Sequence, residues 1–118
     1  MAHKILIVED YDDTREFMHF MLELFGYDVL EAINGREAVE AATNDHPDLI
    51  LMDIGLPIMD GIMATEQIRQ LEKGSKVPVV AVTAHINCRQ KALQAGCNDV
   101  IFKPVEPEYL KKVIASYF

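Results

Sequence analysis

The sequence has few cysteines and few basic residues, and it lacks a long apolar run. Cys88 and Cys97 have neither CxxC spacing nor zinc partners in register, so free cytoplasmic thiols are expected. The 11 Lys and Arg residues against 19 Asp and Glu residues give a formal net charge of −8, which argues against a large nucleic-acid surface. The apolar runs are too short to cross a bilayer, and no signal peptide precedes the first predicted strand. These absences favour a cytoplasmic protein without a membrane span.

What the chain does contain is the composition of a globular domain. Half of its 118 residues are apolar and a quarter are charged. The length suits a single hydrophobic core, and no internal repeat, low-complexity segment or linker divides it. We therefore expect one domain over residues 1–118.

Short apolar runs alternate with helical patterns along the chain. Strands are predicted at residues 4–8, 27–32, 47–53, 79–82 and 100–102. Helices are predicted near residues 13–25, 35–44, 61–71, 87–95 and 107–118, with a turn at residues 73–76. This alternation predicts an α/β fold, in which a doubly wound, flavodoxin-like parallel sheet has the strand order 2-1-3-4-5.

The helices carry further signals. Asp12 or Asp13 is placed to cap the first helix, and Asp60 to cap the third. In the first helix, these apolar residues recur at helical spacing: Phe17, Met18, Met21, Leu22, Leu24 and Phe25. The last helix carries three aromatic residues that could face the core or a partner, and we favour core packing: Tyr109, Tyr117 and Phe118.

Acidic residues end two strands that the predicted order makes neighbours. Glu9 and Asp10 follow the first strand, and Asp53 ends the third after an unbroken apolar run. The helices after these strands leave to opposite faces, so a crevice opens between the strand ends. Three carboxylates in one crevice repel one another unless a cation relieves them, and oxygen ligands on loops suit Mg²⁺ best. We therefore predict a magnesium site, with Asp53 as the nucleophile for a phosphoryl group.

Two further groups end the fourth and fifth strands. Thr83 and Lys103 are expected to project into the same crevice. There a hydroxyl and a cation can bind the oxygens of a transferring phosphoryl group. Pro104 directly after Lys103 permits a cis peptide bond, a minority state of X–Pro bonds, and we expect one here because it would aim the lysine into the site.

Six short motifs follow one another along the chain: Glu9-Asp10, Met52-Asp53-Ile54, Leu56-Pro57, Met59-Asp60-Gly61, Thr83-Ala84 and Lys103-Pro104. In this order they resemble the receiver domain of two-component response regulators, of the chemotaxis-regulator type. The resemblance covers essentially the whole chain. It implies that Asp53 accepts a phosphoryl group from a phosphohistidine on a sensor histidine kinase or a phosphotransfer protein.

The resemblance also implies roles for the other site residues. Asp10 would bind Mg²⁺ directly, Glu9 would assist through water, and the backbone carbonyl of Gly55 would complete the protein ligands beside Asp53. Such a domain hydrolyses its own acyl phosphate slowly, so it is expected to be a signalling switch and not a dedicated enzyme.

The resemblance places Thr83 and Lys103 on the phosphoryl oxygens. Because these residues end strands 4 and 5, the fourth helix, fifth strand and fifth helix are the expected contact face for a downstream partner or an output domain. The fourth helix has few large apolar residues, which predicts loose packing. Met1 lies just before the first strand and nothing follows Phe118, so the chain is either a stand-alone receiver or part of a longer regulator.

Two features of the site are unusual. Receivers of this kind usually carry Tyr or Phe three residues before the lysine, where this chain has Val100. We place Phe102 on the other face of the strand, where it could not replace that ring. His85 and Gly55 flank the predicted entrance, and we hypothesise that they tune the phosphoryl lifetime. The alternative is a solvent-facing His85 with no role.

Three other interpretations are weaker. A phosphatase of the haloacid-dehalogenase type also forms an aspartyl phosphate, but it has a cap domain and a second Asp where this chain has Gly55. A flavin-binding module needs a neutral phosphate loop after the first strand, and the acidic segment at residues 9–13 would repel the phosphate. A scaffold that works without phosphorylation is disfavoured because every required site residue is present.

Overall fold

The computed structural model describes residues 2–56, 58–71 and 76–118. Its sheet contains five parallel strands in the order β2-β1-β3-β4-β5. The strands are β1 (Lys4–Val8), β2 (Asp28–Ala32), β3 (Leu49–Asp53), β4 (Val79–Thr83) and β5 (Asp99–Phe102). The predicted fold class and strand order are therefore confirmed.

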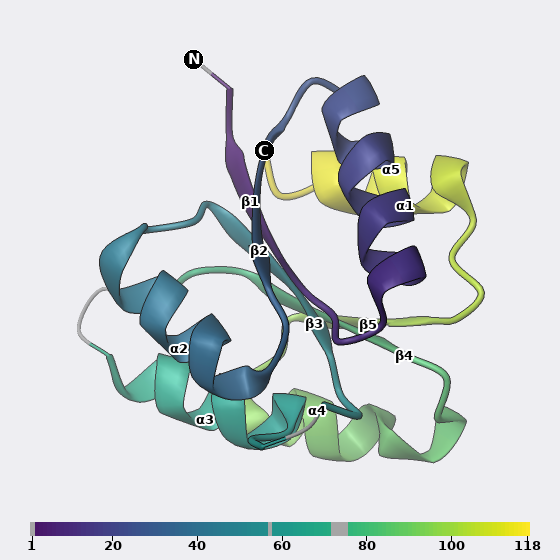
Figure 1. Cartoon of the computed structure of the whole chain (residues 1–118). Coiled ribbons are helices and arrows are strands. Elements are labelled where there is room, and N and C mark those ends of the chain that lie inside the picture. Colours follow the sequence, from purple (N-terminus) through teal and green to yellow (C-terminus); the bar gives the residue numbers. More distant parts are fainter. Residues whose placement is uncertain (1, 57, 72–75) are drawn as a thin grey trace.

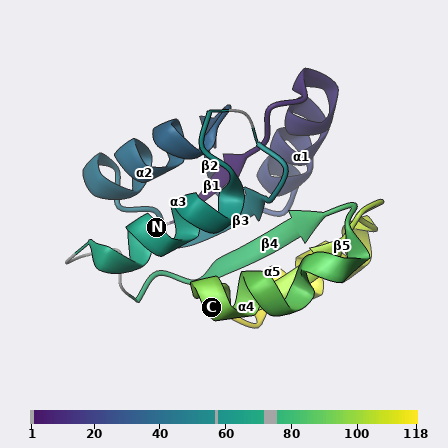
Figure 2. The same ribbon diagram turned by 90° about the horizontal axis from the view of Figure 1, so that it is seen from below.

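Helices cover both faces of the sheet. They are α1 (Asp12–Leu24), α2 (Gly35–Asn44), α3 (Gly61–Gln70), α4 (Arg89–Ala95) and α5 (Pro107–Ala115), and a short 3₁₀ helix, η1 (Ile86–Cys88), leads into α4. Figure 1 shows α1 and α5 on one side of the sheet and α2, α3 and α4 on the other. Figure 2, seen from below, looks onto this second layer, with α3 and α4 toward the viewer.

Each face of the sheet has its own hydrophobic core, as strands without polar alternation require. The core under α2, α3 and α4 includes Leu6, Ile50, Ala38, Ala64 and Ile68. The core under α1 and α5 includes Ile5, Leu51, Leu22, Leu110 and Ile114. In the part of the chain that is described, no helix is long and apolar enough to cross a membrane.

The strand register brings the predicted site residues to one edge. Val8 pairs with Met52, so Glu9 follows β1 beside Asp53. Asp53 in turn pairs with Val82 on β4. Because the carboxyl ends of parallel strands meet at the same edge of a sheet, the residues that end β1, β3, β4 and β5 converge there.

Side-chain caps begin two of the helices. The Asn34 side chain accepts the backbone N–H of Glu37 at 2.8 Å, and the Glu37 carboxylate accepts the N–H of Ile33 at 3.0 Å. The pair is a variant of the capping box, because the Glu37 carboxylate binds the N–H of Ile33, one residue before the cap, and not that of Asn34. Asp60 caps α3 as predicted, because its carboxylate accepts the N–H of Met63 at 2.9 Å.

The predicted cap of α1 is wrong. The N-cap residue is Tyr11, which makes no side-chain cap bond, and both Asp12 and Asp13 lie within the first helical turn. There their charges face the positive end of the helix dipole. Of the predicted turn at residues 73–76, only Lys76 is described; the other three residues and Pro57 lie outside the described ranges.

Several aromatic and apolar residues on helices are exposed. On α1, Met18, Met21 and Leu22 are buried, but Phe17 and Leu24 face solvent. The prediction of core packing is wrong for the exposed Tyr109 and Phe118, while Tyr117 packs partly against the α1–α5 core. For α1 and Tyr109 the cause is geometric, because a helix contacts the sheet along one stripe and the apolar residues here cover a wider arc. Phe118 lies beyond α5, which ends at Ala115, and stacks on the ring of His3.

The placement of Phe102 is also wrong. Val100 is buried in the core under α2, α3 and α4, and the partly buried Phe102 packs against the same core. Residues two apart in a strand share a face, so the two side chains lie on one side of β5. The ring of Phe102 therefore lies on the same face of β5 as Val100, the position where the resemblance implies an aromatic residue.

Candidate functional site

Three carboxylates meet where β1 and β3 end. Oxygen atoms of Glu9, Asp10 and Asp53 all lie within 4.8 Å of one another. Glu9 is only 2% exposed and Asp53 8%, whereas Asp10 is exposed. Charges of one sign this close repel strongly unless a cation compensates them. A cluster that offers only oxygen ligands fits a hard divalent metal ion.

Lys103 brings a cation to this cluster from the end of β5. Its Nζ lies 2.6 Å from Oε1 of Glu9 and 3.5 Å from Oδ2 of Asp53. Burial alone would lower the pKa of Lys103, but the hydrogen bond to Glu9 and the charge of Asp53 outweigh burial and leave the pKa raised. Lys103 is therefore protonated and balances part of the negative charge. The Lys103–Pro104 peptide bond is cis, as predicted.

Glu9 is bound at each of its polar groups. Its N–H donates to the carbonyl of Ala32 at 3.0 Å, and its own carbonyl accepts Nη1 of Arg15 at 3.0 Å. The carboxylate accepts the N–H of Tyr11 at 3.3 Å through Oε2 and Lys103 through Oε1. A nearly buried carboxylate is tolerated in this position because each of its two oxygens accepts a hydrogen bond.

Arg15 belongs to this site, although the sequence patterns did not point to it. Beyond the Glu9 carbonyl, its guanidinium reaches Oδ1 of Asp12 at 2.6 Å and Oε1 of Glu31 at 3.5 Å. The available signal was an arginine three residues after an aspartate in a predicted helix, a spacing that pairs the two side chains. That spacing gives no indication that the arginine also reaches the end of β1.

The backbone around Asp53 is held by a close helix start. Oδ1 of Asp53 accepts the N–H of Gly55 at 3.3 Å. The N–H of Gly61 donates to the carbonyl of Ile54 at 3.0 Å, and a Cβ at Gly61 would stand 2.1 Å from the carbonyl oxygen of Asp53. Only glycine allows α3 to begin this close to Asp53. Gly55 is exposed, and a Cβ there would meet nothing within 4 Å.

Thr83 is fully buried where β4 ends. Its Oγ1 accepts the N–H of His85 at 3.0 Å and lies 3.7 Å from Sγ of Cys88. Its carbonyl accepts the N–H of Lys103 at 2.8 Å. Among the contacts recorded for the described residues, the hydroxyl faces η1 and none joins it to the carboxylates. The strand register therefore brings Thr83 to the same edge of the sheet without a direct bond to the acids.

The two cysteines are free, as predicted, and differ in environment. Cys97 is buried in the core under α2, α3 and α4, and burial raises the pKa of its thiol. Cys88 is partly exposed and donates its S–H to the carbonyl of His85 at 3.0 Å. The exposed side chain of His85 lies in the segment between β4 and η1.

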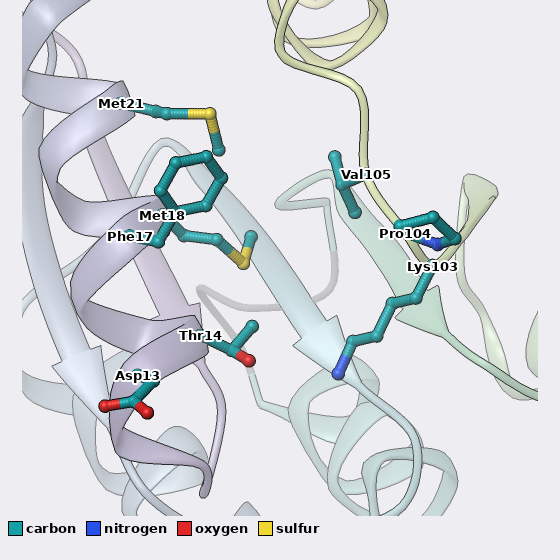
Figure 3. A pocket seen from close by; sticks show the side chains of 8 residues that line it. All are labelled: Asp13, Thr14, Phe17, Met18, Met21, Lys103, Pro104 and Val105. Atoms are coloured by element: carbon teal, nitrogen blue, oxygen red, sulfur yellow. The ribbon is translucent and has the colours of Figure 1, made fainter.

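A pocket adjoins the site on the α1 side (Figure 3). It has a volume of about 330 Å³ and is lined by Asp13, Thr14, Phe17, Met18, Met21, Lys103, Pro104 and Val105. Figure 3 shows the ring of Phe17 and the two methionine side chains on α1 facing Pro104 and Val105 after β5. Lys103 joins this largely apolar pocket to the carboxylate cluster, because its Nζ reaches Glu9 and Asp53.

Comparison with known protein families gives a match over most of the chain. The model of the response regulator receiver domain matches residues 5–115. The chain is 34% identical over 119 residues to the polar-differentiation response regulator DivK of Brucella ovis, covering 99% of this chain and 97% of DivK. It is 39% identical over 115 residues to an uncharacterized 14.6 kDa protein of Leptolyngbya boryana, covering 96% of this chain and 88% of that protein.

A third relative is much longer than this chain. Hybrid signal transduction histidine kinase G of Dictyostelium discoideum is 43% identical over 119 residues, which cover 97% of this chain and 4% of the kinase. Receiver sequences of this kind therefore occur both in short regulators and inside large kinases.

Solved structures agree with the sequence comparison. The receiver domain of a sensor histidine kinase from Pseudomonas aeruginosa superposes with a TM-score of 0.94 at 37% identity, covering 99% of this chain and 98% of that one. That structure has a magnesium ion coordinated in its active-site cleft. Chemotaxis protein CheY4 of Vibrio cholerae gives a TM-score of 0.94 at 27% identity, with full coverage of both chains. The chain therefore belongs to the response regulator receiver domain family, the signalling switches of two-component systems, and its acidic pocket is consistent with a metal-dependent phosphoacceptor site.

Proposed function

We propose that Asp53 accepts a phosphoryl group from a phosphohistidine on a sensor histidine kinase or a phosphotransfer protein. The observation that carries this proposal is the juxtaposition of Asp53 with two other carboxylates within 4.8 Å and with the Lys103 ammonium at 3.5 Å. A carboxylate that attacks phosphorus needs a metal and a cation beside it, because the incoming group is itself negatively charged.

We propose Mg²⁺ as the metal. Asp10 and Asp53 would bind it directly, the carbonyl of Gly55 would add a third protein ligand, and Glu9 would assist through water. The ligand set supports this choice because it consists of oxygen atoms only, and the related receiver domain from Pseudomonas aeruginosa has magnesium in its cleft. When bound, the ion would neutralise charge on the transferring phosphoryl oxygens.

The residues would then divide the work of the transfer. A carboxylate oxygen of Asp53 attacks phosphorus in line; the new P–O bond forms as the donor's P–N bond breaks, and the electron pair returns to the imidazole nitrogen. The Lys103 ammonium forms ion pairs with Glu9 and Asp53, so it would lie close enough to bind an oxygen of a phosphoryl group on Asp53. The Thr83 hydroxyl accepts a hydrogen bond from the backbone N–H of His85. Its own proton can therefore be donated to a phosphoryl oxygen.

The pocket beside Lys103 is the best-placed contact for the phosphodonor protein. A donor histidine must approach Asp53, so the protein that carries it must cover the surface around the cluster. The apolar side chains of Phe17 and Val105 border that surface. We therefore propose that an apolar face of the donor packs between α1 and the segment after β5 during transfer.

Phosphorylation would be communicated to partners from the other side of the site, where β4 and β5 end. Lys103 contacts Asp53 from the end of β5, and its N–H donates to the carbonyl of Thr83 at the end of β4. The neighbouring helix α4 buries only Ala92. We propose that the α4–β5–α5 face changes conformation or mobility and contacts a downstream partner or an output domain. Because Cys88 and Cys97 are free thiols, we propose that this exchange takes place in the reducing cytoplasm.

The test is incubation with acetyl phosphate, followed by intact mass. The proposal predicts one base-labile phosphoryl group per chain, formed only with Mg²⁺ and absent from Asp53→Asn. Phosphorylation that persists in Asp53→Asn would refute the assignment of the acceptor. Multiple-turnover release of phosphate would instead favour a phosphatase of the haloacid-dehalogenase type.

A further inference from the structure

We propose that Arg15 is a positioning residue of the metal site, which holds the peptide group before Asp10 and so aims the Asp10 carboxylate at the metal. The inference rests on the proposed function, because it concerns the same site. No residue of α1 is a proposed metal ligand, so the inference gives this helix an indirect part in metal binding.

The backbone on both sides of Asp10 is fixed. The carbonyl of Glu9, in the peptide group before Asp10, accepts Nη1 of Arg15 at 3.0 Å. The N–H of Tyr11, in the peptide group after Asp10, donates to Oε2 of Glu9 at 3.3 Å. The carbonyl of Tyr11 accepts the backbone N–H of Arg15 at 3.0 Å. Asp10 is exposed, so the direction of its side chain depends on these backbone bonds and not on packing.

Arg15 is itself held in place. Its side chain is only 14% exposed and contacts Asp12 in the first turn of α1 at 2.6 Å and Glu31 on β2 at 3.5 Å. One planar group thus connects the end of β1, the start of α1 and the edge strand. The guanidinium suits this task because its donors have a fixed arrangement and can serve several acceptors at once.

Position and charge predict opposite effects of removing Arg15. A positive charge close to the cluster opposes the binding of a second cation, so its loss alone would tighten metal binding. If Arg15 acts by fixing the backbone before Asp10, its loss weakens metal binding, because the carboxylate must then be ordered when the ion binds. The sign of the change therefore separates the two roles.

The experiment measures the Mg²⁺ dissociation constant without any phosphodonor, by calorimetry and by the amide NMR signals of Asp10 and Gly55. We expect Arg15→Met to raise this constant about tenfold. Arg15→Lys keeps the charge but offers one ammonium to three acceptors, so we expect an intermediate rise. The matched control is Arg36→Met, which removes an exposed arginine that pairs with Glu40 one turn away on α2 at 3.9 Å, and which should leave the constant unchanged.

An unchanged or lower dissociation constant in Arg15→Met overturns the proposal. If that variant does not fold, as judged by circular dichroism, Arg15→Lys decides the question, and an unchanged constant in it overturns the proposal equally. Failure of the proposed function looks different, because wild-type protein would then take up no phosphoryl group from acetyl phosphate. A wild type that is phosphorylated on Asp53, together with an Arg15 variant that binds Mg²⁺ normally, refutes only the role of Arg15.

Discussion

The two sides of the site are built in different ways. At the β1–β3 end, which comprises Glu9, Asp10, Asp53 and the loops that follow them, the backbone is held by bonds to Arg15 and Ala32 and by the close start of α3. At the β4–β5 end, which comprises Thr83, η1, α4, β5 and Lys103, η1 buries no residue and α4 buries only one.

The difference matches what the proposed function requires of each end. A nucleophile and its metal ligands must be held in a fixed geometry, because small displacements reduce catalysis. A surface that reports the added charge must instead have a second arrangement close in free energy, which weak packing allows. The comparison therefore predicts that substitutions at the β1–β3 end affect chemistry and stability, and that the response to phosphorylation is concentrated at the β4–β5 end.

The largest expected effect is that of Lys103→Met, because Lys103 is the group that connects the two ends. Loss of its ammonium leaves the buried Glu9 carboxylate without its 2.6 Å partner and removes a cation from the transferring phosphoryl group. We expect the rate of phosphorylation by acetyl phosphate at saturating Mg²⁺ to fall about 100-fold. Lys91→Met, at an exposed position in α4, is the control; an equal fall in both variants would show that Lys103 has no special part.

Gly61→Ala should cause the largest loss of stability at the β1–β3 end. Its Cβ would stand 2.1 Å from the Asp53 carbonyl oxygen, so α3 or β3 must shift, at a cost of about 3 kcal/mol in the free energy of unfolding. Gly55→Ala, whose Cβ meets nothing within 4 Å, should change that free energy by less than about 0.5 kcal/mol. Urea unfolding of both variants checks the pair, and equal stabilities would contradict the close approach of α3.

Phe17→Ala tests the pocket between the two ends. Because Phe17 lines the pocket, we expect the KM for a phosphodonor protein to rise about tenfold, while the rate with acetyl phosphate stays unchanged. Phe20→Ala removes an exposed ring of the same helix that does not line the pocket, and it should behave like the wild type. A tenfold effect in Phe20→Ala as well would place the donor elsewhere on α1.

The smallest effect concerns Cys97, which lies between α4 and β5 and is buried in the core beneath α4. Burial raises the pKa of its thiol above the unfolded value of about 8.5, so the unfolded state loses this proton first as the pH rises. The contribution of Cys97 to the free energy of unfolding is fully present below the pKa of the unfolded thiol. It is lost as the pH rises above that value, by up to about 1.4 kcal/mol per pH unit. Urea unfolding should show that the free energy of unfolding falls less between neutral and alkaline pH in Cys97→Ala than in the wild type. Equal losses would mean that Cys97 does not contribute.

The sequence was sufficient for the sheet and for most of the site. Unbroken apolar runs such as residues 49–52 predict strands that are covered on both faces, and the βα alternation then favours the strand order. The same order places Glu9, Asp10 and Asp53 together, because residues that end neighbouring parallel strands share an edge. The side-chain cap at Asp60 was predictable because its signal is local.

Features that depend on tertiary contacts were not predictable. Helical periodicity finds the apolar residues of α1 but does not show that Met18 faces the sheet while Phe17 lines a pocket. The sequence places Lys103 in the site but does not show that its shortest contact is with Glu9. Arg15 reaches the end of β1 because α1 packs on the sheet, which the local sequence does not show. The placement of Phe102 was an error in strand parity and not a limit of the sequence.

Hydrogen exchange before and after phosphorylation tests the central claim most directly. The measurement follows backbone amides by mass spectrometry in the wild type, with and without a phosphoryl group on Asp53, and in Asp53→Asn treated identically. The account predicts that exchange changes mainly in η1, α4, β5 and α5, changes little in α1, and does not change in Asp53→Asn. A response centred on α1, or an equal response in Asp53→Asn, would contradict it.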